Sequence, residues 1–600
     1  MNRSIPDILF ERLQAAAATA FGPDVALDRA WLRSTNDPKF GDYQFNGALP
    51  LAKQLGAKPR ELADKLKDAL ALDDLCAPPE VAGPGFLNLR LSTDFLNRYL
   101  QEVPPADPAS EYDRLGVAPA TQPDKVVVDM SSPNLAKEMH VGHLRSTVIG
   151  ESVARILEFA GHDVERVNHV GDWGTQFGML LAHLRATQPQ ALGDLDHLAI
   201  SDLEGFYREA KQHFDSDAAF ADEARRTVVQ LQGGDPETLR IWRAFCAESL
   251  RHCHAVYAAL DITRLVDRGE SFYNAQLADV VDELSQKGLV EKSEGADCVF
   301  VEGFKTREGE PLPFLVRKSD GGFLYATTDL AAARFRIRDC GATRVIYVVG
   351  LPQKQHFEML FAVLRKAGWA HEGVQLEHLG FGSMLDASGA PFKTRAGGTV
   401  KLKNLLDEAV DRARIVVEAG NDDPESVRGQ LSAADRAHIA ETVGIAAVKY
   451  FDLSHNLSTD YRFDWDHMLA LDGNTAPYML YAYARIRSIA RKAGVDFASL
   501  PADAPITLEH ESEIALAKAV ARFPEIVASL VRDLRPSLLT EYLFELSRSF
   551  SRFYDRKLGV RVIDAEPESL RISRLRLCDL TARVIHTGLQ LLGIPTIEKM

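Results

Sequence analysis

His140 and His143 flank Gly142, and this grouping is the one in the chain best suited to chemistry on a phosphate. Each neutral imidazole offers one N–H donor and one acceptor nitrogen. The glycine has no side chain, so phosphates can lie close to the backbone beside it. Fixed donors of this kind stabilise negative charge that develops on phosphoryl oxygens. The pattern therefore points to binding and reaction of a nucleoside polyphosphate.

The residues around this pair predict a strand, a loop and a helix. Residues 125–128 are a short β-branched run typical of a buried strand, and Ser131 and Pro133 mark a turn after it. Apolar residues then recur at helical spacing over residues 148–159. The start of that helix would stand at the carboxyl end of a parallel strand, where anions bind. We therefore predict an α/β fold: a doubly wound parallel-sheet (Rossmann-like) catalytic domain.

Composition narrows the class of protein. The chain has 600 residues, which is too long for a single core. Of these residues, 46% are hydrophobic and 26% are charged, as in ordinary globular proteins. Its six cysteines are scattered without a Cys-x-x-Cys pair, which argues against a disulfide framework or a zinc site. No apolar run approaches the ~20 residues of a membrane helix, and the N-terminus lacks the apolar stretch of a secretory signal. We expect a cytoplasmic protein without a membrane partner.

Charge is unevenly distributed along the chain. The net charge of −16 argues against a nucleic-acid binder at first sight. Residues 474–600, however, carry 18 basic and 15 acidic side chains, which leaves 51 basic and 70 acidic side chains (69 − 18 and 85 − 15) for the rest. A basic tail on an acidic body favours local contact with a polyanion. An uneven solvated surface is the alternative.

Longer stretches resemble one enzyme family. The run His140-Val-Gly-His143 is similar to the His-Ile-Gly-His signature of class I aminoacyl-tRNA synthetases, and residues 133–147 look like the form found in arginyl-tRNA synthetases. Residues 171–178 resemble the family's Gly-Asp-Trp-Gly-x-Gln-Phe-Gly run. Residues 40–43 and 85–88 resemble its extra N-terminal domain. The resemblance thus covers nearly all of the chain.

The resemblance implies a domain plan. Residues 1–110 would form an α+β domain that contacts tRNA, and residues 111–400 the catalytic domain, with a connective insertion at about 185–320. A helical stem would follow over residues 401–473. Residues 474–600 would form an all-α anticodon-binding domain.

The resemblance also implies a reaction. ATP and L-arginine would give arginyl-adenylate, and the arginyl group would pass to the 3'-terminal ribose of tRNA(Arg). Mg²⁺ should accompany ATP, while zinc, an organic prosthetic group and DNA are not expected, and we expect a monomer. The residues assigned to catalysis are His140, His143, Lys137, Lys393 and Arg395; those assigned to ATP are His140, Gly142, His143, Gly382, Met384 and Lys393.

One of these assignments departs from the family pattern. Class I enzymes carry a Lys-Met-Ser-Lys-Ser loop, whose lysines neutralise the triphosphate. Here residues 392–395 keep Lys393 and Arg395 as cations but lack the usual lysine spacing. Lys137, just before the histidines, is expected to supply the missing charge.

The arginine side chain should be recognised by carboxylates. Tyr325 and Asp329 lie four apart, so they would share a face if a helix starts there; helix capping is the alternative. A carboxylate beside a phenol suits a planar, permanently charged guanidinium. With the help of the resemblance, the arginine-binding set is Ser131, Asn134, Glu270, Tyr325, Asp329 and Gln353, with Gln355 as an alternative to Gln353. Asp172 is expected to shape the same pocket or to stabilise its own loop.

Cations alternate with aromatic residues in the basic tail. That combination suits phosphate contact and stacking on unpaired bases. The residues assigned to tRNA are Arg485, Arg487, Arg548, Arg552, Tyr554 and Arg556. Three alternatives stay open: a class I synthetase for another amino acid such as cysteine or glutamine, a non-catalytic tRNA-binding relative, and a nucleotidyltransferase that uses no tRNA.

Overall fold

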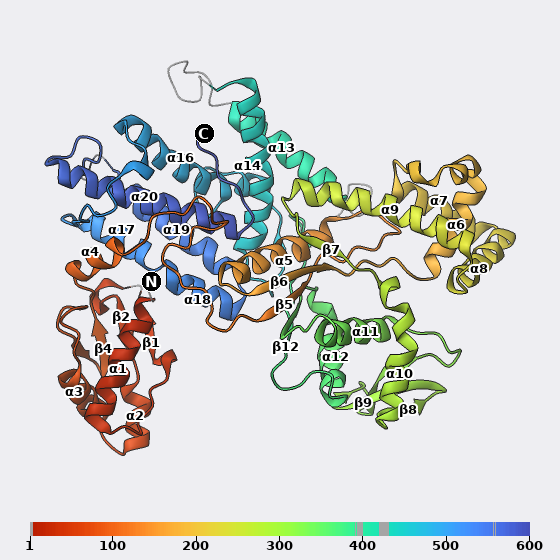
Figure 1. Cartoon of the computed structure of the whole chain (residues 1–600), viewed down its shortest axis with the longest axis horizontal. Helices are drawn as coiled ribbons and strands as arrows, with labels where there is room; N and C mark the ends of the chain where they lie inside the picture. Colours follow the sequence, from red (N-terminus) through yellow and green to blue (C-terminus); the bar gives the residue numbers. More distant parts are fainter. Residues whose placement is uncertain are drawn as a thin grey trace.

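The computed structural model describes residues 4–35, 37–390, 392, 400–418, 431–555, 557 and 560–600. Figure 1 shows a red N-terminal domain beside the blue C-terminal helices, with the central parallel sheet between them and the yellow and green insertions. Three residues assigned from the sequence, Lys393, Arg395 and Arg556, lie outside the described residues.

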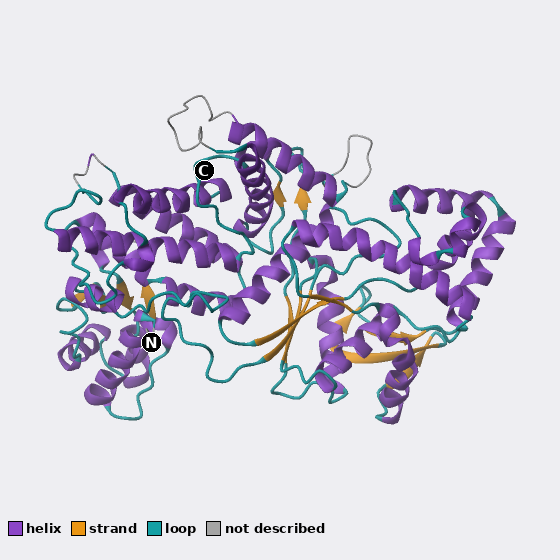
Figure 2. Ribbon diagram, turned by 45° about the horizontal axis from the view of Figure 1, so that its top comes forward, coloured by secondary structure: helices purple, strands orange, loops and turns teal. Residues whose placement is uncertain are grey.

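A five-stranded parallel sheet forms the centre of the molecule (Figure 2). Its spatial order is β12 (Gln375–His378), β11 (Arg344–Tyr347), β5 (Lys125–Asp129), β6 (Asp163–Asn168) and β7 (Leu265–Asp267). The chain order reverses between β11 and β5, so the carboxyl ends of these two strands flank the crevice where ligands bind in such sheets. The predicted doubly wound fold is confirmed.

Helices α5 (Val141–Phe159), α6 (Thr175–Thr187) and α12 (Lys354–Lys366) come after strands β5, β6 and β11 of this sheet. Helix α11 (Tyr325–Arg338) instead precedes β11 in the chain. Helix α5 is buried along almost its whole length, and Leu144, Val148 and Ile156 belong to the main core. The predicted strand–loop–helix unit is therefore present.

The connective insertion differs from the expected single block at about residues 185–320. Strand β7 lies within that range and pairs with β6 in the central sheet. One part, before β7, is helical: η3 (Pro189–Gly193), η4 (Leu195–His197), α7 (Leu203–Ser216), α8 (Ala218–Gln232) and α9 (Pro236–Ala259). The other contains η5 (Glu270–Gln276), α10 (Leu277–Gln286) and the antiparallel strands β8 (Val290–Ser293), β9 (Ala296–Lys305) and β10 (Pro311–Arg317). A three-residue strand is too short to be recognised by periodicity. Strand β7 divides the range proposed for the insertion into these two parts.

The N-terminal domain is an α+β unit, as predicted. Its antiparallel sheet has the order β1 (Leu32–Ser34), β2 (Tyr43–Phe45), β4 (Phe86–Leu89) and β3 (Glu80–Ala82). Its helices are α1 (Ile5–Phe21), α2 (Ala48–Leu55), α3 (Pro59–Ala69) and α4 (Thr93–Gln101), with short 3-10 turns η1 (Arg29–Trp31) and η2 (Pro38–Phe40). The Tyr43 hydroxyl donates to Glu525 of the C-terminal domain at 3.0 Å, so the two domains are in direct contact.

The remaining chain is almost entirely helical. The stem consists of α13 (Leu402–Glu418), α14 (Ala433–Ser454), β14 (Tyr461–Arg462) and α15 (Trp465–Met468). The C-terminal domain contains α16 (Ala476–Ala493), η7 (Phe497–Ser499), α17 (Glu511–Ala521), α18 (Phe523–Asp533), α19 (Pro536–Phe553) and α20 (Glu568–Leu591). Within the described ranges, no helix is long and apolar enough to cross a membrane.

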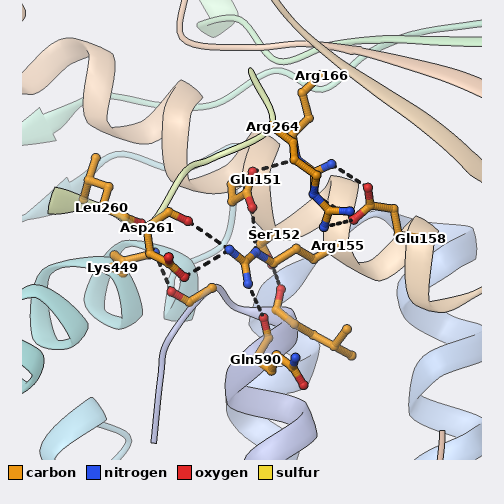
Figure 3. A network of polar contacts seen from close by, with 12 residues as sticks. Glu151, Ser152, Arg155, Glu158, Arg166, Leu260, Asp261, Arg264, Lys449 and Gln590 are labelled. Carbon is orange, nitrogen blue, oxygen red and sulfur yellow. Dashed lines mark hydrogen bonds and ion pairs between the residues drawn. The ribbon is translucent and has the colours of Figure 1, made fainter. Parts of the chain in front are cut away.

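A polar network joins the C-terminal half of α5 to three other parts of the chain (Figure 3). Arg155 pairs with Glu151 at 2.6 Å and with Asp261, just after α9, at 3.2 Å. The buried Lys449 of α14 donates to the carbonyl of Leu260 and, at 2.5 Å, to that of Gly593 beyond α20. Because buried charges need such partners, the insertion, stem and last helix are fixed relative to the helix that begins at the two histidines.

Candidate active site

The loop between β5 and α5 places both histidines at the helix start. Ser131 and Ser132 adopt positive φ angles of 67° and 51°, which turn the chain away from the strand. His140 is the N-cap residue, with extended φ and ψ angles of −120° and 170°. The first N–H groups of α5 therefore face the carboxyl end of β5, as the sequence predicted.

Backbone contacts fix the tautomer of both rings. Nδ1 of His140 accepts the N–H of Gly142 at 3.0 Å, and Nδ1 of His143 accepts the N–H of His140 at 3.1 Å. A nitrogen that accepts carries no proton, so each ring keeps its proton on Nε2 as a donor. Burial lowers the pKa of His140, and it lowers that of His143 to about 3, with the positive form of His140 adding to the shift. The ring centroids are 4.0 Å apart, so two neutral donors stand side by side.

The segment from Glu138 to Val141 is held by two other parts of the chain. The N–H of Val141 donates to the carbonyl of Val400 at 3.0 Å, and His140 forms an antiparallel bridge with Lys401. Lys401 bridges Glu138 and Asp202 at 3.0 Å each.

The exposed Lys137 contacts the insertion. Its Nζ lies 4.4 Å from the centroid of the Tyr207 ring in α7. A cation over an aromatic face is attracted to the ring. This contact places the Lys137 side chain against α7, three positions before His140 in the sequence.

Gly382 and Met384 join the catalytic domain to the stem. Met384 pairs with Tyr461 through the short parallel strands β13 (Met384–Leu385) and β14. The N–H of Gly382 donates to Leu457 at 2.9 Å, and its carbonyl accepts from the buried Arg145 at 2.7 Å. A Cβ at Gly382 would lie 2.5 Å from the carbonyl of Thr459, so only glycine fits. Both main-chain groups of Gly382 are therefore used inside the protein.

The predicted guanidinium contacts lie at the start of α11 and beside it. Helix α11 begins at Tyr325, so Tyr325 and Asp329 share a face as expected. Oδ2 of Asp329 is 2.6 Å from Nε2 of His356, and Oδ1 is 3.9 Å from Nε2 of His169. The side chain of Tyr325 is 63% exposed, and Gln353 is exposed in η6 (Leu351–Gln353), which follows β11.

Glu270 and Asp172 add two carboxylates to this region. Asp172 accepts the N–H of Ser271 at 2.8 Å and its hydroxyl at 2.5 Å, which ties the loop after β6 to η5. Burial, followed by the negative charges of Asp172 and Asp329, raises the pKa of Glu270 to about 7. Asp172, Glu270 and Asp329, from the segments after β6, β7 and β10, thus form a cluster of acidic groups. Of the two roles considered for Asp172, the contacts support the loop-stabilising one.

Ser131 and Asn134, both assigned to arginine binding from the sequence, occupy different environments. The Ser131 hydroxyl is buried and bonds Tyr257 at 2.8 Å and Thr147 at 3.0 Å. Asn134 is exposed, and its Oδ1 accepts the N–H of Ala136 at 2.9 Å, which orients the side-chain amide. Of the two, only Asn134 presents its side chain to solvent.

The residues assigned to tRNA divide between two grooves. Arg485 lies 5.2 Å from the Tyr554 ring, and both line a groove that also includes Lys492 and the terminal Met600. The other groove lies between the N- and C-terminal domains and is lined by Arg548, Arg552, Lys518, Arg522 and Thr35, among others. Arg487 instead pairs with Glu598 at 2.9 Å, so its charge is partly neutralised.

Comparison with known families agrees with this arrangement. Residues 111–465 match the class I (R) tRNA synthetase catalytic domain, residues 479–600 the DALR anticodon binding domain, and residues 7–91 the arginyl tRNA synthetase N-terminal domain. The chain belongs to the arginyl-tRNA synthetase family. Members of this family are ligases that use ATP.

Similarity to members of the arginyl-tRNA synthetase family extends over the whole chain. A curated arginine–tRNA ligase of Nostoc sp. is 51% identical over 596 residues, which cover 98% of each chain. That of Synechococcus elongatus is 50% identical over 598 residues and 99% of each chain. The solved arginyl-tRNA synthetase of Plasmodium falciparum is 30% identical and superposes with a TM-score of 0.86 over 100% of both chains.

Several contacting residues were not found from the sequence. His169 and His356 on either side of Asp329, Tyr207 under Lys137, and Lys401 beside the arginyl-tRNA synthetase signature all approach from distant parts of the chain. His356 stands three positions after Gln353, in a segment that the sequence placed at the carboxyl end of a strand. That position was a usable signal, because such ends line the ligand crevice.

Proposed function

We propose that this chain activates L-arginine with ATP and transfers it to the 3'-terminal ribose of tRNA(Arg). The observation that carries the proposal is that hydrogen-bond donors and carboxylates lie in separate places along one edge of the sheet. Neutral imidazole donors follow β5, while Asp172, Glu270 and Asp329 belong to segments that follow β6, β7 and β10. Donors suit phosphoryl oxygens and carboxylates suit a guanidinium.

In activation, a carboxylate oxygen of arginine forms a bond to the α-phosphorus of ATP, and the bond from phosphorus to the pyrophosphate oxygen breaks. Negative charge grows on the phosphoryl oxygens. The Nε2–H groups of His140 and His143 meet that charge without reorganising, and the positive end of the α5 dipole adds to their effect. The exposed Gly142 leaves room for the phosphates.

Positive charge assists the same step. Lys137 is proposed as a cation near the phosphates, and Lys393 and Arg395 are proposed for the triphosphate from the sequence alone. Mg²⁺ is expected to be held mainly by ATP phosphates and water, the usual arrangement for this ion. Gly382 and Met384 are proposed to contribute to ATP binding indirectly, because they anchor their segment to the stem.

Arginine is proposed to bind with its backbone groups near Asn134 and its guanidinium near Asp329, Tyr325, Glu270 and Gln353. The side-chain acceptors fit a planar cation with five N–H donors. The raised pKa of Glu270 supports this role, because an arriving cation would return the group to its charged form. The buried Ser131 hydroxyl supports the loop that carries Asn134.

The tRNA is proposed to contact both grooves of the C-terminal region, with Arg485 and Tyr554 in one and Arg548 and Arg552 in the other. Arginine beside an exposed aromatic ring suits an unpaired base. We further propose a cytoplasmic monomer. All six cysteines are free, which supports a reducing compartment.

An aminoacylation assay with tRNA(Arg) and each of the twenty amino acids tests the function. Arginine alone should become attached to the tRNA, with one AMP and one pyrophosphate formed per charged tRNA. Charging by another amino acid would support a different class I enzyme. Tight tRNA binding without charging would support a non-catalytic relative.

A further inference from the structure

We propose that His356 is a positioning residue for arginine recognition, which holds the Asp329 carboxylate and the Tyr325 ring in place for the guanidinium. The inference rests on the proposed function, because it takes Asp329 and Tyr325 as guanidinium contacts. It adds a residue that contacts both of them from another helix, α12, three positions after Gln353.

The hydrogen bond to Asp329 has a defined direction. Nε2 of His356 lies 2.6 Å from Oδ2 of Asp329. An ionised carboxylate only accepts, so the imidazole donates. Bonds to a charged acceptor are short and about twice as strong as neutral ones. The side chain of His356 is only 13% exposed, so water competes weakly for this donor.

Packing fixes the imidazole plane. The ring stacks on Phe314 of β10, with centroids 5.7 Å apart and planes 21° apart. Its centroid is also 5.0 Å from that of the Tyr325 ring. His356 therefore contacts α11 twice, through Asp329 and through Tyr325, and packs against the antiparallel sheet through Phe314.

The carboxylate keeps acceptor capacity after this bond is made. An ionised carboxylate has about four lone-pair sites, and His356 occupies one of them. Oδ1 lies 3.9 Å from Nε2 of His169, beyond hydrogen-bond distance. His356 thus fixes the plane of the carboxylate and leaves sites for two parallel N–H groups of a guanidinium.

A fixed carboxylate plane bears on specificity. A guanidinium forms two parallel bonds and needs the plane in one orientation, whereas an ammonium is a point charge that tolerates several. Losing the bond from His356 should therefore weaken the guanidinium end of the ligand more than its backbone end. This difference separates a positioning role from a general role in folding.

Two substitutions separate the bond from the packing. His356→Phe keeps an aromatic ring between Phe314 and Tyr325 but removes the donor. His356→Gln loses the ring but places an amide N–H near the position of Nε2. The readouts are the arginine KM, the ATP KM, kcat, and competitive inhibition by agmatine, which has the guanidinium without the carboxylate, and by norvaline, which has the backbone groups without the guanidinium.

For His356→Phe, the arginine KM and the agmatine inhibition constant should rise about 10- to 100-fold, the range for a hydrogen bond to a charged group. Norvaline inhibition, the ATP KM and kcat at saturating arginine should stay unchanged. His356→Gln should recover most of the agmatine affinity. The matched control is His254→Phe, which removes a second His–Asp contact of 2.6 Å, to Asp267, and should leave all constants unchanged.

Three results would overturn the inference. Tighter agmatine binding in His356→Phe would mean that the imidazole competes with the substrate for Asp329. An equal loss for agmatine, norvaline and ATP would mean general damage to the fold. Unchanged agmatine binding in His356→Phe, with weakened binding in Asp329→Asn, would refute the role of His356 alone. Unchanged agmatine binding in Asp329→Asn would refute the proposed arginine site itself.

Discussion

The proposed nucleotide side of the site, with His140 and His143, and the proposed arginine side, with Asp329 and Glu270, differ in how burial changes the pKa values of their residues. Burial removes the charged form of an isolated group, so it lowers the pKa of His143 to about 3 and raises that of Glu270 to about 7. For the histidine, the neutral form is the useful one, because its Nε2–H is needed as a donor. For the glutamate, the charged form is the useful one. Under the proposed function, His143 is therefore in its useful form before the nucleotide binds, while Glu270 reaches its useful form when the guanidinium arrives.

Substituting Asp329 should weaken arginine binding without affecting ATP binding, and this is the largest effect that we expect. Asp329→Asn removes the charge that a guanidinium would meet, which costs about 2–5 kcal/mol, or roughly 30- to 5,000-fold in arginine KM. The ATP KM should not change. Asp339→Asn, on an exposed carboxylate at the other end of α11, is the control. Equal effects of Asp329→Asn on arginine and ATP would contradict the division of the site.

Substituting His143 should break the nucleotide side alone. His143→Asn can still accept the N–H of His140 but lacks a donor at the position of Nε2. Losing one such donor lowers kcat by about 10²–10³. Pyrophosphate exchange in the presence of tRNA measures this, and His143→Gln, which restores an N–H near that position, is the matched variant. Near-normal exchange in His143→Asn would remove the histidine from the mechanism.

The two sides should also differ in their response to pH. With a pKa of about 7, the charged fraction of Glu270 falls about tenfold between pH 8 and pH 6, so the arginine KM should rise about tenfold over that range. The ATP KM should stay level, because His143 is neutral throughout.

Variants at two glutamates test this pH dependence. Glu270→Gln should have a high arginine KM at every pH, while the exposed Glu308→Gln should keep the wild-type slope. An equal pH slope for arginine and ATP in the wild-type enzyme would show that the titrating group is not specific to the arginine side.

The same comparison shows what the sequence could predict. The strand–loop–helix unit, the doubly wound sheet and the start of α11 at Tyr325 follow from local periodicity and turn residues, which the sequence carries directly. The tautomers of His140 and His143 depend on the N-cap geometry of α5, which local patterns do not specify. The contact of His356 with Asp329 joins residues 27 positions apart, and it arises only when α11 and α12 pack together.

The nucleotide side also shows where local patterns fail. Lys401 contacts Glu138 although the insertion and most strands of the central sheet lie between them in the sequence. The resemblance assigns Gly382 to ATP, yet its N–H and carbonyl bond Leu457 and Arg145. Residue type suggests which chemistry a segment could perform, but tertiary packing decides which main-chain groups stay available.

A substitution in the C-terminal domain lies away from both proposed ligand sides, so it should change neither the ATP KM nor the arginine KM. Arg485 lies over the Tyr554 ring, whereas Arg487, two positions away, is already paired with Glu598. Removing one cation from a nucleic-acid contact costs on the order of 1 kcal/mol, so Arg485→Gln should raise the tRNA KM roughly fivefold and reduce its salt dependence by about 0.7 in log–log slope. Arg487→Gln should have a smaller effect on both quantities, since its charge is partly neutralised in the free protein. Aminoacylation at several salt concentrations measures both variants, and a larger effect at Arg487 would mean that tRNA breaks the Glu598 pair to use that arginine.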